Sequence, residues 1–195
     1  MCGEYPSAMR IIAGKAKGHI LKSVKGDTTR PITDRTKEAL FNILGADIIQ
    51  ASFLDCFAGT GSVGIEALSR GASFTRFIDQ NQKAIQVIRE NLKLTGLLEQ
   101  AEIIRADAFT ILTKQPDRQF DYIYIAPPQY HELWSKMLIL IEENMNWLAE
   151  KGWIIAQIHP IEYVDLIKEG KIHNFEEFDH RKYGSTQLIF YRKET

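Results

Sequence analysis

Cysteine is scarce in this chain, where only Cys2 and Cys56 occur among 195 residues. Two cysteines so far apart make neither a disulfide framework nor a metal-binding motif. The five histidines show no metal-ligand spacing either, so we expect no metal site. A protein without a disulfide framework fits a reducing compartment, and we expect a cytoplasmic location.

Long apolar runs are also missing. No stretch reaches the roughly 20 residues that a membrane-spanning helix needs. The segment from Met1 to Pro6 lacks the charged and apolar regions of a signal peptide. Internal repeats and low-complexity segments are absent as well. We therefore expect no membrane-bound partner.

The composition that is present is ordinary for a globular protein, with 45% hydrophobic and 25% charged residues. A chain of this length can form one α/β domain with a substantial core, but not two. The formal net charge of −1 argues by itself against a strong polyanion binder. The distribution of charge suggests that one end of the chain meets a polyanion. Residues 1–37 carry eight basic and three acidic side chains, whereas the remainder is net acidic.

The basic N-terminal part predicts a small β-hairpin. Residues 9–13 and 19–24 are short strand-like runs, and the segment 14–18 with its glycines and lysines turns between them. We therefore divide the chain into residues 1–30, a leader and basic hairpin suited to meet a polyanion, and residues 31–195, the main domain.

Strand and helix patterns alternate through the main domain. The predicted strands are 52–57, 74–79, 101–106, 120–125 and 153–158, and the predicted helices are 34–48, 62–70, 80–94, 107–114, 131–148 and 161–168. Such alternation predicts right-handed βαβ units and a mostly parallel sheet. Two final strands, 174–182 and 186–192, have no helix between them, so they predict an antiparallel hairpin. The expected fold is a three-layer, Rossmann-like α/β domain with seven strands, as in many methyltransferases.

A glycine-rich loop follows the first parallel strand, with Gly59, Gly61 and Gly64 before a helix. Ligands of open α/β sheets bind beyond the carboxyl ends of the strands. Glycine lets the backbone turn sharply and approach a ligand, and the helix start offers free N–H groups. This G-x-G-x-x-G pattern alone does not separate a dinucleotide from S-adenosylmethionine.

Three acidic residues at successive strand ends favour S-adenosylmethionine. Asp55 precedes the loop, where its carboxylate suits a cationic amino acid group and would repel a pyrophosphate. Asp79 is placed to bind both ribose hydroxyls, and Asp107 is placed to accept from the adenine amino group. Each acid alone would more simply be a helix cap or a solvated loop residue.

A twin-proline segment follows the fourth parallel strand, in the order Ala126, Pro127, Pro128, Gln129 and Tyr130. Two prolines restrict the backbone and remove two N–H donors, which leaves carbonyl groups facing the cleft. Methylation of an exocyclic amine needs acceptors that orient its hydrogens, and an aromatic ring can stack on the target base. The alternative is a plain turn that ends a strand.

With these motifs in view, the chain resembles the RsmD-type methyltransferases, which modify a guanine N2 in bacterial 16S ribosomal RNA. The resemblance covers roughly Met9 to the end. It is strongest in the segments 10–14, 30–42, 55–61 and 66–71. The Arg-Pro segment within 30–42 is more specific than the glycine loop. The resemblance implies S-adenosylmethionine as cofactor and ribosomal RNA or a small-subunit particle as partner.

The residues expected to act fall into three groups. Cofactor binding is assigned to Asp55, Phe57, Gly59, Thr60, Gly61, Asp79, Asp107 and Ala108. Catalysis is assigned to Pro127, Pro128, Gln129 and Tyr130. RNA binding is assigned to Arg10, Lys15, Lys17, Arg30, Arg35 and Lys37.

One position departs from the family, which usually has Asp or Asn where this chain has Ala126. Alanine offers no side-chain acceptor, so one hypothesis gives that role to the Pro127 carbonyl and the Gln129 side chain. The opposing hypothesis is an RNA-binding or ribosome-assembly factor that has lost catalysis. Methylation of another amine in RNA or DNA, and a nucleotide-dependent oxidoreductase, are further alternatives.

Overall fold

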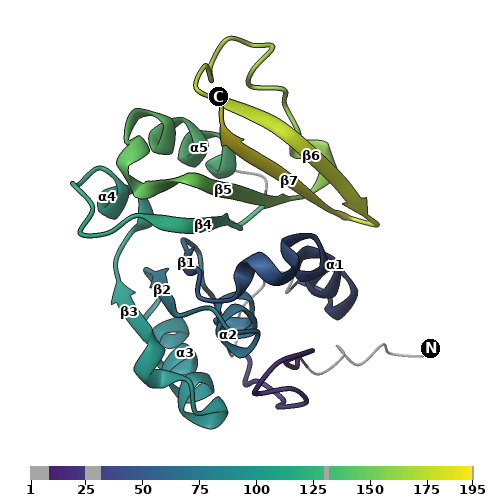
Figure 1. Ribbon diagram of the computed structural model, residues 1–195, viewed down its shortest axis with the longest axis vertical. Coiled ribbons are helices and arrows are strands. Elements are labelled where there is room, and N and C mark those ends of the chain that lie inside the picture. The colour runs from purple at the N-terminus through teal and green to yellow at the C-terminus, as the bar shows by residue number, and fades with distance from the viewer. Residues whose placement is uncertain (1–8, 25–31, 130–131, 195) are drawn as a thin grey trace.

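The computed structural model describes residues 9–24, 32–129 and 132–194, and it is built around one seven-stranded sheet (Figure 1). The strand order is β3-β2-β1-β4-β5-β7-β6. Neighbouring strands from β3 to β5 are parallel, whereas β7 is antiparallel to both β5 and β6. The strands are β1 Ser52–Asp55, β2 Phe74–Asp79, β3 Ala101–Arg105, β4 Phe120–Ile125, β5 Leu148–Ile158, β6 Phe175–Tyr183 and β7 Thr186–Lys193. The predicted fold class is confirmed.

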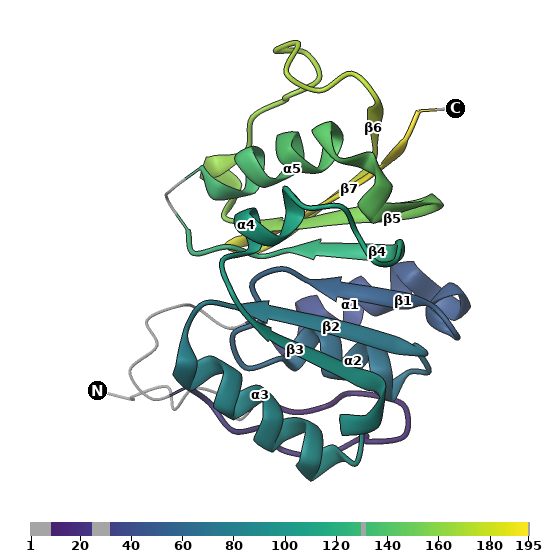
Figure 2. The ribbon, with the colours of Figure 1, turned by 90° about the vertical axis from the view of Figure 1, so that its left-hand side faces the viewer.

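Helices cover both faces of the sheet and bury a separate apolar cluster on each (Figure 2). One face carries α1 Asp34–Leu44, α2 Ser62–Ser69 and α3 Gln82–Thr95; the other carries α4 Ala108–Leu112 and α5 Leu133–Glu143. Short 3-10 helices occupy Gly45–Ile48, Leu98–Gln100, Met145–Trp147 and Pro160–Glu162. None of the helices in the described ranges is long and apolar enough to cross a membrane.

Local chemistry explains where several helices begin and end. The Thr33 side chain accepts a hydrogen bond from the Thr36 N–H and caps α1. Asn81 caps α3 in the same way, and Gly96 ends that helix in the left-handed conformation. Every residue of α2 is buried, including the polar Ser62, Glu66 and Ser69.

The predicted N-terminal hairpin forms only in part. One antiparallel bridge joins Arg10 and Ile20, and no extended strands flank it. Backbone hydrogen bonds still cross the hairpin, from the Ile11 N–H to the His19 carbonyl and from the Leu21 N–H to the Met9 carbonyl. The N–H groups of Ile12 and Ala13 donate to Glu66 of α2 at 2.8 and 3.0 Å. Residues 9–24 thus form an arm that is held both by its own cross-strand bonds and by α2, and we call this segment the N-terminal arm.

The second half of the domain differs from the prediction in its boundaries. The predicted helix 131–148 is shorter, and β5 begins at Leu148 rather than at residue 153. A register shift against β4 accommodates the extra residues, and Gly152 permits it, because a Cβ there would lie 3.0 Å from backbone oxygens. The predicted helix 161–168 is wrong: only Pro160–Glu162 is helical, as a single 3-10 turn.

Candidate active site

The glycine loop and the twin-proline segment lie at the same edge of the sheet. The loop follows β1 and the prolines follow β4, and these strands are adjacent and parallel, with Asp55 opposite Tyr124. Carboxyl ends of parallel strands share an edge, which Figure 2 shows at the left. We call it the carboxyl edge.

Hydrogen bonds with β2 and α3 fix the conformation of the glycine loop. Gly59 and Gly61 have φ angles of 55° and 77°, which favour glycine. The Gly59 N–H donates to Asp79 Oδ2 at 2.8 Å, and the Asn91 side chain donates to the Thr60 carbonyl at 3.0 Å. A Cβ at Gly59 would meet nothing within 4 Å, so open space lies beside the loop.

Asp55 is a buried carboxyl group whose Oδ1 has no hydrogen-bond partner among the described residues. Burial raises the pKa of Asp55 to about 7; backbone N–H groups of Gly64 and Phe57 lower it, and the charge of Asp79 raises it. An unpartnered buried carboxyl oxygen calls for a cation or a donor. The residues present therefore fit the cationic amino acid group of S-adenosylmethionine.

The other two acids also serve the local backbone. Besides bonding Gly59, Asp79 accepts from the Asn81 N–H through Oδ1 at 2.8 Å. Asp107 is exposed and caps α4, accepting from the Phe109 N–H and the Thr110 hydroxyl. Both acids lie at the carboxyl edge as expected, but each carries a structural duty that the sequence analysis had treated as the alternative.

Aromatic and apolar side chains continue from the loop toward α4. Phe57 is half-buried and contacts Phe109 edge to face, with ring centroids 6.2 Å apart. Ala108 is buried at the start of α4. The contact between Phe57 and Phe109 thus joins the segment after β1 to α4.

The twin-proline segment is partly accessible. Ala126, Pro127 and Gln129 are half-buried, and Pro128 is exposed. Tyr130 lies outside the described residues. Beneath the segment, the Tyr124 hydroxyl donates to the Gln157 side chain, which ties the end of β4 to the end of β5. Pro127, Pro128 and Gln129 therefore follow a strand end that is held by a side-chain hydrogen bond to β5, and we call them the twin-proline corner.

The expected RNA-binding residues are not brought together at one place. Arg10 and Arg35 are exposed beside the first turn of α1, where Arg10 Nε bonds Asp34 at 2.8 Å. Lys15 and Lys17 are exposed at the opposite end of α2 from the glycine loop, because the Lys15 N–H donates to the carbonyl of Ser69. Arg30 lies outside the described residues.

Lys37 corrects the sequence analysis. Its side chain is fully buried, and Nζ donates to the Arg10 carbonyl at 2.6 Å and lies 3.6 Å from Glu66 Oε2. Burial lowers the pKa of Lys37, and the nearby Glu66 carboxylate raises it. Because the ammonium is enclosed, it cannot reach an RNA phosphate; it joins α1 to the N-terminal arm.

Three further residues shape the site without having been singled out. Met9 contacts the glycine loop, because its sulfur accepts from the Thr60 hydroxyl at 3.1 Å. Asn91 joins that loop to the N-terminal arm by also donating to the Lys22 carbonyl. Glu66 bonds the arm and Arg70 together. The backbone groups that Asn91 and Glu66 bond are distant in sequence, so no local pattern indicates these roles.

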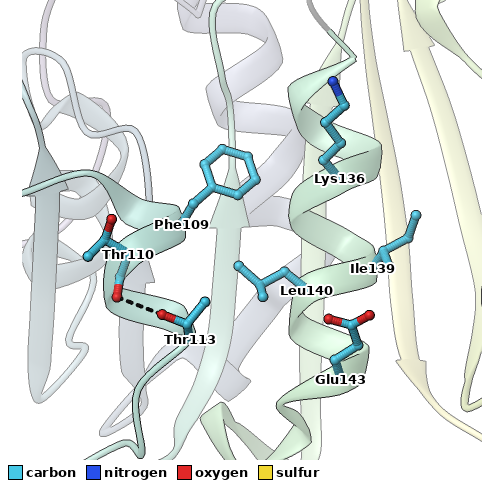
Figure 3. A pocket seen from close by; sticks show the side chains of 7 residues that line it. All are labelled: Phe109, Thr110, Thr113, Lys136, Ile139, Leu140 and Glu143. Carbon is cyan, nitrogen blue, oxygen red and sulfur yellow. Dashed lines mark hydrogen bonds between the residues drawn. The ribbon is translucent and has the colours of Figure 1, made fainter.

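A separate hollow of about 540 Å³ lies between α4 and α5 (Figure 3). Phe109, Leu140 and Ile139 supply most of its apolar lining, with Lys136 and Glu143 at the α5 side. It contains none of the expected cofactor or catalytic residues, so it is distinct from the site. The described residues also contain no group of three or more His, Cys, Asp or Glu side chains that could hold a metal ion.

Comparison with known proteins gives consistent matches along nearly the whole chain. The family model described as "Conserved hypothetical protein 95" matches residues 9–192. A Bacillus subtilis protein named "Putative rRNA methyltransferase YlbH" is 42% identical over 192 residues, covering 95% of this chain and 99% of that protein.

Two further comparisons agree. The "Ribosomal RNA small subunit methyltransferase D" of Haemophilus influenzae is 36% identical over 187 residues, covering 94% of this chain and 92% of that protein. The solved structure titled "Putative methyltransferase yhhF from Escherichia coli" has a TM-score of 0.83 and 29% identity, covering 96% of this chain and 98% of that one.

Proposed function

The chain belongs to the Conserved hypothetical protein 95 family, and from that premise we propose that it transfers a methyl group from S-adenosylmethionine to the N2 amine of a guanine in small-subunit ribosomal RNA. The relatives named for methylation of small-subunit ribosomal RNA support the substrate class. The proposed partner is that RNA or a small-subunit particle, and a cytoplasmic location is part of the proposal.

One observation carries the proposal: a buried carboxyl group with one oxygen unpartnered among the described residues, an open glycine loop and a twin-proline corner share the carboxyl edge on two adjacent strands. Adjacent strands lie about 4.8 Å apart, so ligands held at the two strand ends would be neighbours. A methyl donor and an acceptor amine need this proximity, because orientation supplies much of the rate.

Several residues of this edge would hold S-adenosylmethionine, which supplies an electrophilic methyl group when bound. Asp55 would pair with its ammonium group, and Asp79 would accept from its ribose hydroxyls. Asp107 and Ala108 would receive the adenine. The open space at Gly59 leaves room for close backbone approach.

The twin-proline corner would position the acceptor amine. The Pro127 carbonyl and the Gln129 side-chain oxygen would accept its two hydrogens, which directs the nitrogen lone pair at the methyl group. Ala126 offers no side-chain acceptor, so Gln129 takes over a role that the family usually gives to Asp or Asn. The target guanine must leave its stack to reach this corner.

Methyl transfer to a defined nucleotide tests the function. Unmodified small-subunit particles and free small-subunit RNA are incubated with labelled cofactor, and the methyl group is mapped. We expect one labelled guanine, modified at N2. Label on another base, or on DNA alone, would contradict the proposed substrate. Absence of cofactor-dependent label would favour the alternative of a non-catalytic assembly factor, which the missing acceptor at Ala126 motivates.

The role of Gln129 is tested in the same assay. We expect Gln129→Ala to lower kcat by about tenfold or more, because one amine hydrogen loses its acceptor. Gln129→Glu, which keeps an acceptor oxygen, should retain more activity. Unchanged turnover by Gln129→Ala would remove this residue from the mechanism.

A further inference from the structure

The turn between β6 and β7 lies at the carboxyl edge, although the sequence analysis gave it no function. Because β7 is antiparallel to β5, its start lies beside the end of β5, with Gln187 opposite Ile158. β6 ends at the same place, where Tyr183 is opposite Thr186. In Figure 1 the arrowheads of β4 and β6 accordingly point to the same side.

Two cationic side chains, Arg181 and Lys182, lie at the end of β6, after the acidic Glu176, Glu177 and Asp179. His180, Arg181 and Lys182 are consecutive and exposed. Arg181 pairs with Asp179 through Nε at 2.9 Å, and 58% of its side chain remains exposed. Lys182 has no ion-pair partner in the part of the chain that the structure describes. The turn thus presents two cationic side chains to solvent on an otherwise acidic body.

The strand register distributes these side chains over both faces of the turn. Arg181 is opposite Leu188 and shares its face, on which Tyr183 packs against the α1-side cluster. Lys182 is opposite Gln187 and lies on the other face. The end of β6 therefore carries a half-buried ring beside Arg181 on one face and a second cation on the other. This combination suits single-stranded nucleic acid, by stacking on bases and pairing with phosphates.

We propose that Arg181, Lys182 and Tyr183, which we call the β6–β7 tip, form a second RNA contact that binds nucleotides flanking the target guanine. This inference rests on the proposed function. Three strand spacings of about 4.8 Å separate β4 from β6, so the tip lies about 14 Å from the twin-proline corner. That distance is too long for the target base and suits its neighbours along the strand.

The tip complements the contacts expected from the N-terminal part. Arg10 and Arg35 lie beside the start of α1, and Arg181 lies on the same face of the sheet. The site would therefore have cations on two flanks. Phosphate contacts of this kind orient the RNA without reading its sequence.

Charge removal at the tip tests the inference. Binding of unmodified small-subunit RNA is measured over a series of KCl concentrations for wild type and for Arg181→Gln/Lys182→Gln. We expect about tenfold weaker binding and a salt slope lower by about 1.4, at about 0.7 per single-strand phosphate contact. In the methylation assay, KM for RNA should rise similarly with kcat unchanged.

A matched control removes two charges from the opposite edge. Lys114→Gln/Lys151→Gln neutralises two exposed lysines, one after α4 and one near the start of β5. This variant should keep wild-type RNA affinity. Both double variants should keep wild-type S-adenosylmethionine affinity and melting temperature, because the four side chains are exposed.

The ring is tested separately. Tyr183→Phe should bind RNA like wild type, and Tyr183→Leu should bind about fivefold or more weakly, because only the latter loses stacking. Equal RNA affinity and salt slope for the tip and control variants would overturn the inference. If wild type binds RNA but transfers no methyl group, the proposed function fails while the binding measurements still decide the tip.

Discussion

At the scale of single residues, the burial of Asp55 makes the binding of a cationic ligand favourable. Its carboxyl group is enclosed, and one of its oxygens has no partner in the described part of the chain, so the charged form is costly until a cation binds. The proposed cofactor supplies that cation. Because its pKa is about 7, the Asp55 carboxyl group changes its charge near neutral pH.

This arrangement predicts pH-dependent cofactor affinity. Free Asp55 is protonated below its raised pKa, so binding the ammonium group there first requires loss of the proton. Calorimetric titration should give S-adenosylmethionine affinity that falls roughly tenfold from pH 7.5 to pH 6. Asp55→Asn should bind more weakly at pH 7.5 and lose this dependence. A wild-type profile as flat as that of the variant would contradict the assigned role.

Lys37 shows that a residue in a basic segment can be buried within the protein. Its position in a basic segment suggested a phosphate contact, whereas its Nζ bonds the Arg10 carbonyl inside the protein. Composition counts charges but does not say which are enclosed. The partner, Glu66, is 29 positions away in the sequence.

At the scale of elements, contacts with Ser69 hold the N-terminal arm against the end of α2 that lies opposite the glycine loop. The Ala16 N–H donates to the Ser69 hydroxyl, which itself donates to the Ala13 carbonyl. Gly14 lies so close to α2 that an added Cβ would be 1.8 Å from the Ser69 carbonyl oxygen. Only glycine permits this approach.

Two glycines of the arm provide a matched test of that contact. Gly14 and Gly18 have similar φ angles, 82° and 86°, but a Cβ at Gly18 would meet nothing within 4 Å. Gly14→Ala should lower the free energy of unfolding by about 2–4 kcal/mol, and Gly18→Ala by about 1 kcal/mol. Chemical denaturation measures both. Equal losses would mean that backbone conformation alone, and not the contact with α2, sets the effect.

The strand and helix pattern was largely predictable from local sequence, because buried parallel strands are apolar runs and helices carry caps. The helix predicted for residues 161–168 was wrong, because the apolar residues of this segment suggested a helix that does not form. The chain instead makes one 3-10 turn capped by His159 and continues in turns. There the Trp134 indole N–H donates to the Glu162 carbonyl, a tertiary contact that local pattern does not reveal.

At the scale of the whole molecule, ligand binding at the carboxyl edge should stabilise the fold. A ligand present at 100 times its Kd raises the free energy of unfolding by about 2.7 kcal/mol. Thermal unfolding with S-adenosylmethionine should show this increase, and NAD at the same concentration should leave the melting temperature unchanged. Stabilisation by NAD alone would favour the oxidoreductase alternative.

The sequence by itself determined the order of strands and helices, the glycine loop, the twin prolines and the family resemblance, because each depends on residues close together in the chain. Only the tertiary structure decided which charges are buried, as at Lys37, and which distant segments share an edge. Pairing of β5 with β7 brings the β6–β7 tip to the carboxyl edge. Such placement depends on hydrogen bonds between remote strands, whose register no local pattern specifies.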